Sequence, residues 1–143
     1  MAVPKKFREG LLGVREDYTG EELMVTFGLS GQLFVFSKEG FEDFSNRYSA
    51  LPGEDADLLD RFFGASAMEC ALDGQGRILL ARGWKEFAGL EKDVVWVGQR
   101  GHVELWSSLR WQEALEAVQR GIFMATSENL KQAYSRIDFN SPI

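Results

Sequence analysis

The chain has little cysteine, histidine or proline, with one, one and three of these residues among 143. The lone cysteine, Cys70, excludes an internal disulfide, and we expect it to be a small buried apolar side chain. The lone histidine, His102, has no second His or Cys at ligand spacing, so no zinc site is expected. No apolar run reaches the roughly 18 residues of a membrane span, and no signal-peptide pattern is present. We therefore expect a cytoplasmic protein with no membrane partner.

The residue patterns of common enzymes are also missing. There is no Ser-His-Asp or Cys-His pairing, no Gly-x-x-x-x-Gly-Lys phosphate loop and no cluster of metal ligands. Four acidic residues gather where a helix is predicted to begin: Glu54, Asp55, Asp57 and Asp60. Carboxylates at a helix start usually stabilise the helix through its dipole. We expect no catalysed reaction, no cofactor and no small-molecule substrate.

Positive charge is scarce as well. The chain has 16 Lys and Arg against 22 Asp and Glu, which gives a net charge of −6. Because the phosphate backbone of nucleic acids favours a basic surface, a nucleic-acid partner requires the cations to be gathered in one patch. Apolar and aromatic residues are plentiful, at 45% and 13%. They indicate a folded globular protein of about one domain's length.

A two-part internal repeat organises the sequence. Residues 24–36 (MVTFGLSGQLFVF) align without a gap with residues 94–106 (VVWVGQRGHVELW) at an offset of 70. Closer to the N-terminus the offset becomes 77, which places residues 4–9 over 81–86 and leaves extra residues of the first copy in a loop at 14–22. Such self-similarity indicates two copies of one structural unit.

Each copy predicts a short helix, two paired strands and a longer helix. The short helices are expected to begin at Pro4 and near Trp84, and to end at Gly13 and Gly89. The strands are expected at 24–27, 33–36, 94–97 and 102–106. Ser37 and Ser107 or Ser108 can cap the longer helices. On these two helices the apolar residues fall on one face: Phe41, Phe44, Tyr48 and Leu51 on the first, Trp111, Ala114, Leu115 and Val118 on the second.

Between and after the copies the patterns are shorter. A helix is expected at 56–63, a strand at 65–72, a turn at 73–77 and a strand at 78–81. The second long helix is expected to end before Gly121, and a last helix is expected at 130–137. The predicted division is a first repeat at 1–52, a second repeat with its preceding helix at 53–120, and a tail at 121–143.

Four segments of the second copy carry a family resemblance: DGQGRILL at 73–80, FAGLEK at 87–92, VGQ at 97–99 and ELW at 104–106. They resemble the second repeat of the MraZ family of bacterial transcriptional regulators. The resemblance implies an α+β fold, a SpoVT/AbrB-like double-split β-barrel made of two pseudo-symmetric repeats with flanking helices. It covers roughly residues 1–120 and is more specific in the second copy than in the first. The first copy lacks the usual Asp-x-x-x-Arg turn.

The resemblance also implies a function. It suggests a sequence-specific DNA-binding regulator, a repressor of the bacterial division and cell-wall gene cluster, that is associated with the nucleoid. Its partners would be promoter repeats in double-stranded DNA and further copies of itself in a homo-oligomeric ring. Several weak units linked in one ring then bind through avidity.

The turn at 73–77 contains the first candidate DNA-binding residues, Asp73 and Arg77. In the resembled family this turn contributes to the DNA-facing surface, and a planar guanidinium suits a phosphate or a guanine. For Asp73 a structural role is also open, since its carboxylate can accept backbone N–H groups in an Asx-type turn in which Gly74 and Gly76 supply positive φ. Arg77 is alternatively a solvated surface arginine.

A second set of candidates comes from the two short helices, where a basic-aromatic-basic pattern occurs twice. Its cations are Lys5, Lys6 and Arg8 in the first copy and Arg82 and Lys85 in the second. These residues either extend a positive rim beside the turn or form the solvated faces of two helices. Their aromatic neighbours, Phe7 and Trp84, are expected in the core. The family's proline is kept as Pro4 and replaced by Ala81.

Two further hypotheses concern the first copy. Since Met1 falls over Ile78, we expect the natural reading frame to begin upstream and to encode a strand and turn equivalent to residues 65–77. The alternative function is a structural or protein-interaction module that kept the barrel and lost DNA binding. The net charge and the missing first turn favour it.

Overall fold

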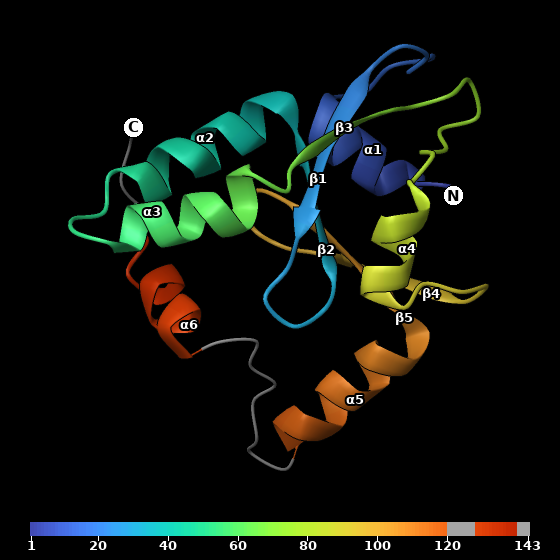
Figure 1. Ribbon diagram of the computed structural model, residues 1–143. Coiled ribbons are helices and arrows are strands. Elements are labelled where there is room, and N and C mark those ends of the chain that lie inside the picture. Colours follow the sequence, from blue (N-terminus) through green and yellow to red (C-terminus); the bar gives the residue numbers. More distant parts are fainter. Residues whose placement is uncertain (120–127, 140–143) are drawn as a thin grey trace.

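The computed structural model describes residues 1–119 and 128–139. They form a five-stranded antiparallel sheet in the order β3-β1-β2-β5-β4, with helices on both sides (Figure 1). The strands are β1 Glu22–Phe27, β2 Leu33–Ser37, β3 Met68–Ala71, β4 Val94–Gly98 and β5 Val103–Ser107. The helices are α1 Lys5–Leu12, α2 Lys38–Ser49, α3 Asp55–Leu59, the π-helix η1 Asp60–Gly64, α4 Arg82–Ala88, α5 Ser108–Gln119 and α6 Glu128–Ser135.

These elements confirm the predicted α+β class, the two short helices and the two hairpins. The closed double-split barrel remains a prediction. Gly121, before which α5 was expected to end, lies outside the described residues. Among the helices of residues 1–119 and 128–139, none combines the length and the apolar character that crossing a bilayer requires.

The two copies meet at the centre of the sheet, where β2 pairs with β5. Phe34 is paired with Glu104, its own counterpart at the offset of 70. Leu33 pairs with Leu105 and Val35 pairs with Val103, so the register is symmetric about the central pair. A pseudo-twofold axis therefore passes through this pair and relates one hairpin to the other.

The first strands of the two hairpins are not equivalent at the offset of 70. Met24 pairs with Phe36, whereas Trp106, the counterpart of Phe36, pairs with Val95 rather than Val94. The gap-free alignment was therefore wrong by one residue over β1 and β4. The cause is the turn: the first hairpin closes with a loop at 29–31, and the second closes with Arg100 and Gly101 alone.

Each face of the sheet covers its own apolar core. One core lies beneath α1 and α4 and contains Leu23, Val25 and Trp84. The other lies beneath α2, η1 and α6 and contains Tyr48 and Phe63. Figure 1 shows α2, α3 and α6 on one side of the sheet and α1 and α4 on the other. Side chains that alternate along a strand point to opposite faces, and this alternation supplies both cores.

Helix ends follow the expected capping pattern. The hydroxyl oxygen Oγ of Ser37 accepts from the backbone N–H of Gly40 at 2.9 Å, and Oγ of Ser107 accepts from the N–H of Arg110 at 3.0 Å. Helix α4 ends at Gly89, whose φ of 62° is in the left-handed region. These contacts satisfy backbone groups that a helix end leaves without intrahelical partners.

Two strand predictions were wrong in extent. The strand expected at 65–72 is shorter, because η1 and its turn continue to residue 66. Cys70 is buried as expected and so is Leu72, whereas Met68 is 43% exposed. Of the strand expected at 78–81, only Ile78 forms a bridge, to Leu72, and a second isolated bridge joins Arg77 of the turn to Ala2.

Candidate nucleic-acid interface

The turn at residues 73–77 is held by one carboxylate. Oδ1 of Asp73 accepts from the backbone N–H of Gln75 at 2.8 Å and from that of Arg77 at 3.0 Å. These bonds, that of Arg77 first, hold the pKa of Asp73 below its usual value. Gly76 has a φ of +74°, but Gly74 is not in the left-handed region, so only one of the two glycines was needed for positive φ. The Asx-type turn predicted from the sequence is therefore confirmed.

The same carboxylate orients the arginine of the turn. Nε of Arg77 donates to Oδ2 of Asp73 at 2.9 Å, and the Arg77 side chain is 53% exposed. Within the described ranges its two Nη groups have no hydrogen-bond partner. Because the guanidinium is planar, fixing Nε fixes the direction of both Nη groups. The turn thus presents a preorganised pair of N–H donors to solvent.

Lys85 lies in the same corner of the molecule as Arg77. The segment Met1–Val3 runs beside the turn, and the backbones of Met1 and Ile78 bond to each other at 2.8 Å. Burial lowers the pKa of the Met1 amino group first, followed by the positive charges of Arg77 and then Lys85. The charges of both cations therefore act on the same amino group. The side chain of Lys85 is exposed and forms no ion pair with any described residue.

Helix α1 approaches the other side of the turn. A cavity of about 430 Å³ is lined by Lys5, Arg8 and Glu9 of the helix, by Arg15, Glu16 and Tyr18, and by residues 74–76. The side chain of Lys5 is 81% exposed, with Nζ 3.9 Å from Glu9. Lys6 is also exposed, and its Nζ lies 4.8 Å from the centre of the Phe7 ring. Lys5 therefore borders the turn directly.

Arg8 occupies a different position from the other candidate cations. Its Nη1 donates to the carbonyl of Val3 at 2.6 Å, and its guanidinium carbon lies 5.8 Å from the centre of the Tyr18 ring. A Cβ added at Gly76 would meet Nη1 of Arg8 at 2.5 Å. Arg8 is half-buried beneath the turn, where its Nη1 faces the backbone and its Nε is buried without a hydrogen-bond partner among the described residues.

Arg82 has a side chain that is 92% exposed, and its Nε lies 3.0 Å from Glu86. Exposed ion pairs of this kind contribute only about 0–1 kcal/mol, so a phosphate can replace the carboxylate. The aromatic neighbour Trp84 is buried and Phe7 packs against the same core, as expected. The structure thus gathers Arg77, Lys85 and Lys5 around the turn and directs Arg8 inward.

A loop that contains none of the predicted DNA-binding residues also borders the turn. It comprises residues 14–21 and is called the acidic loop below. The backbone N–H of Leu72 donates to the carbonyl of Glu21 at 2.8 Å, and Thr19 Oγ1 would lie 3.3 Å from a Cβ at Gly74. The only sequence signal for it was the length difference between the copies. This loop is therefore the segment in which the two copies differ most in length.

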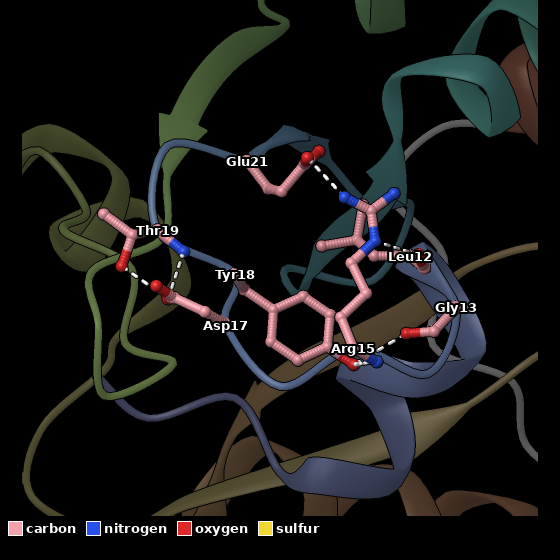
Figure 2. Close-up of polar contacts among 7 residues, drawn as sticks. All are labelled: Leu12, Gly13, Arg15, Asp17, Tyr18, Thr19 and Glu21. Carbon is pink, nitrogen blue, oxygen red and sulfur yellow. Dashed lines mark hydrogen bonds and ion pairs between the residues drawn. The ribbon is translucent and has the colours of Figure 1, made fainter.

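Figure 2 shows how the acidic loop is ordered. The buried ring of Tyr18 places its hydroxyl against the carbonyl of Gly13, to which it donates at 2.6 Å. Arg15 donates to the carbonyl of Leu12 at 3.1 Å and pairs with Glu21. The conformation of the acidic loop therefore depends on contacts with the end of α1 and on the ion pair between Arg15 and Glu21 within the loop.

Asp17 closes the outer part of the same loop. Its Oδ1 accepts from the hydroxyl of Thr19 at 2.6 Å and from the backbone N–H of Thr19 at 2.9 Å (Figure 2). The hydroxyl bond, followed by the backbone bond, lowers the pKa of Asp17 from its usual value. Both bonds favour the ionised carboxylate of Asp17, and they join it to Thr19, the residue of the loop nearest Gly74.

A metal site would require a cluster of ligand side chains among the described residues. Within 1–119 and 128–139, no group of three or more His, Cys, Asp or Glu side chains is placed to hold a metal ion.

Comparison with known proteins gives one family. The family model described as "MraZ protein, putative antitoxin-like" matches residues 63–133. A protein of Lachnoclostridium phytofermentans named transcriptional regulator MraZ is 42% identical over 111 residues, which are 77% of this chain and 73% of that protein. Proteins of the same name from Thermoanaerobacter sp. (strain X514) and Moorella thermoacetica are 41% and 40% identical, over 78% and 79% of this chain and 73% and 75% of their own lengths.

Proposed function

Because this chain belongs to the MraZ family, we propose that it is a sequence-specific DNA-binding regulator of transcription whose DNA-facing surface centres on the turn at residues 73–77. The relatives named transcriptional regulator MraZ support the regulatory role. The observation that carries the proposal for the turn is the anchoring of Arg77 by Asp73. The regulator acts at the nucleoid by occupying a promoter and catalyses no reaction.

Arg77 reads or grips the DNA. With Nε held by Asp73, the two Nη groups form a fork that matches O6 and N7 of guanine in the major groove, or two oxygens of a phosphate. An arginine that is already oriented loses less side-chain entropy on binding than a freely rotating one. Asp73 is in this mechanism a positioning residue that does not touch DNA.

The surrounding cations bind the phosphate backbone. Lys85 and Lys5 flank the turn, and the exposed Arg82 and Lys6 extend the positive surface along α4 and α1. Phosphate contacts fix the position of a protein on the duplex, whereas base contacts give sequence preference. Arg8 supports the shape of the turn from beneath. This division explains how an acidic protein can still present a basic DNA-binding face.

A second copy of the chain covers the outer face of α5 in our proposal. Helix α2, the counterpart of α5 in the first copy, buries Tyr48 completely against η1 and α6. In α5 the equivalent residue, Val118, is 61% exposed, and the neighbouring Leu115 is 45% exposed. An apolar helix face left open on one copy of a repeat, while its counterpart is covered, is the expected mark of a subunit contact.

The outer edge of β4 supports the same assembly. Strand β1 has neighbours on both sides, β2 and β3, whereas its counterpart β4 pairs only with β5 among the described strands. Unpaired edge groups favour addition of another strand. We infer that a strand of a second copy pairs here, which completes the double-split β-barrel and links the subunits into a ring. Linked subunits then bind promoter repeats with avidity.

DNA binding tests the proposal directly. The probe is a labelled duplex that carries the promoter repeats of the division and cell-wall gene cluster, compared with a shuffled duplex over a range of salt concentrations. We expect preference for the promoter and a steep salt dependence. Arg77→Ala should weaken binding and lower the salt slope by about one phosphate contact.

Arg61→Ala is the matched control, because Arg61 is an exposed arginine of η1 on the opposite side of the sheet. It removes the same charge and should leave DNA affinity unchanged. If the unaltered protein binds neither duplex, the proposed function is wrong and the protein-interaction module replaces it. If the unaltered protein binds the promoter duplex and Arg77→Ala binds it with the same affinity, Arg77 is not part of the site.

A further inference from the structure

The acidic loop places negative charge beside the DNA-facing turn. Within the loop, Arg15 and Glu21 neutralise each other as an ion pair. Glu16 and Asp17 are exposed and have no cationic partner among the described residues. The bonds from Thr19 lower the pKa of Asp17, which favours its ionised form. Two uncompensated negative charges therefore remain next to the turn.

The loop lies close enough to affect any duplex at the turn. Glu16 lines the same cavity as Lys5 and residues 74–76, and Thr19 Oγ1 would lie 3.3 Å from a Cβ added at Gly74. In Figure 1 the loop between α1 and β1 and the segment after β3 occupy the same corner of the molecule. Charges interact over about 8 Å at physiological salt, so phosphates held at the turn experience repulsion from the loop.

The position of this loop is fixed by the fold. Tyr18 is buried, and its hydroxyl bonds to Gly13 at the end of α1. The backbones of Gly20 and Glu21 bond to Leu72, immediately before the turn. Because both ends are attached, the loop cannot swing away from a bound duplex without breaking these contacts. The second copy has no equivalent loop, since its helix α4 is followed closely by β4.

From these observations we propose that the acidic loop is a specificity element that lowers the affinity of the turn for DNA in general. Non-specific binding rests almost entirely on the attraction between cations and phosphates, and Glu16 and Asp17 oppose that attraction. A single turn then holds DNA weakly, and stable binding depends on the base contacts of Arg77 and on several linked subunits. This inference rests on the proposed function of the turn.

The test neutralises the two charges without changing the shape of the loop. In the double variant Glu16→Gln, Asp17→Asn, the amide oxygen of the new Asn can still accept from Thr19. The matched control is Glu54→Gln, Asp57→Asn, which removes the same charges from exposed positions at the start of α3. The probe is a labelled duplex of random sequence, titrated at low and at near-physiological salt.

We expect the loop variant to bind random duplex roughly tenfold more tightly at low salt, and the gain to shrink as salt rises because screening weakens both charges. The control should bind like the unaltered protein. An equal gain in the control, or no gain in the loop variant, overturns the inference. If the unaltered protein binds promoter DNA through Arg77 and the loop variant gains nothing, only this inference fails. If neither protein binds DNA, the proposed function fails with it.

Discussion

Nε2 of His102, the residue before β5, lies 4.0 Å from Oε2 of Glu104, and both side chains are largely buried. The carboxylate already accepts from Gln32 Nε2 and from Trp106 Nε1, both at 3.0 Å. The imidazole packs against the ring of Phe34 with centres 4.5 Å apart, and its Nε2 has no hydrogen-bond partner. Burial lowers the pKa of His102 to about 4. The histidine is therefore held neutral inside the fold.

This histidine predicts that stability falls in mild acid. The pKa of His102 in the unfolded chain is about 6.5. Between about pH 6.5 and pH 4 the imidazole is therefore protonated in the unfolded state and neutral in the folded state, which favours unfolding. Stability is therefore complete above about pH 6.5 and declines as pH falls towards 4, by about 2 kcal/mol at pH 5. Urea denaturation at several pH values measures it. His102→Gln removes this part of the pH dependence, and an unchanged profile in that variant would contradict the assignment.

A second prediction concerns the carboxylate of the turn. Asp73→Ala removes a negative charge from the proposed DNA-facing surface, which by charge alone would strengthen binding. We expect weaker binding, because Arg77 loses the partner of its Nε and the backbone N–H groups of Gln75 and Arg77 lose their acceptor. Anisotropy titration with promoter duplex decides between the two effects. Tighter binding would mean that Asp73 does not position Arg77.

A third prediction concerns the outer face of α5. Leu115→Glu with Val118→Glu places two charges on the exposed apolar face and should convert the proposed oligomer to smaller species. Light scattering at micromolar concentration measures the mass. Leu109→Glu is the control, because Leu109 is 68% exposed on the same helix but away from that face. A clean monomer in the unaltered protein would count against both the ring and the avidity argument.

A fourth prediction concerns the core beneath α2. Phe63 is fully buried, and its ring centre lies 5.0 Å from Phe44 and 5.9 Å from Phe34. Phe63→Ala should cost about 3–5 kcal/mol of unfolding free energy, since it removes a large apolar side chain and leaves a cavity. Phe41→Ala, at a half-buried position, should cost less. Equal losses in the two variants would show that Phe63 is not central to this core.

The helices and hairpins were predictable because local residues determine them. Ser37 caps α2 and Gly89 ends α4, and each of these signals is read from a few neighbouring residues. The one-residue difference in register between β1 and β4 was not predictable, since the two sequences align without a gap. It arises from different loop hydrogen bonds, which join Gly28 to Gln32 in the first hairpin and Gln99 to His102 in the second. Chain spacing does not reveal which loop bonds form.

Features that depend on distant contacts were also missed. The apolar face of α5 was visible in the sequence, but periodicity gives the face and not what covers it, so the exposure of Val118 was unexpected. Arg8 matched Lys85 in the pattern of basic residues, yet its direction is set by the carbonyl of Val3 and the ring of Tyr18. A basic residue in a repeat pattern is therefore not by itself a surface cation.

The pairing of β2 with β5 also imposes an order on how the protein is made. Phe34 and Glu104 are 70 residues apart, so β2 leaves the ribosome long before the strand that pairs with it. Until β5 follows, one side of β2 has no hydrogen-bonded neighbour, and an open strand edge invites aggregation. A nascent chain stalled at α4 would already contain Arg77 and the whole turn but not the centre of the sheet. The contacts that hold the turn can therefore form before the two copies join, and the centre of the sheet closes only after β5 has been made.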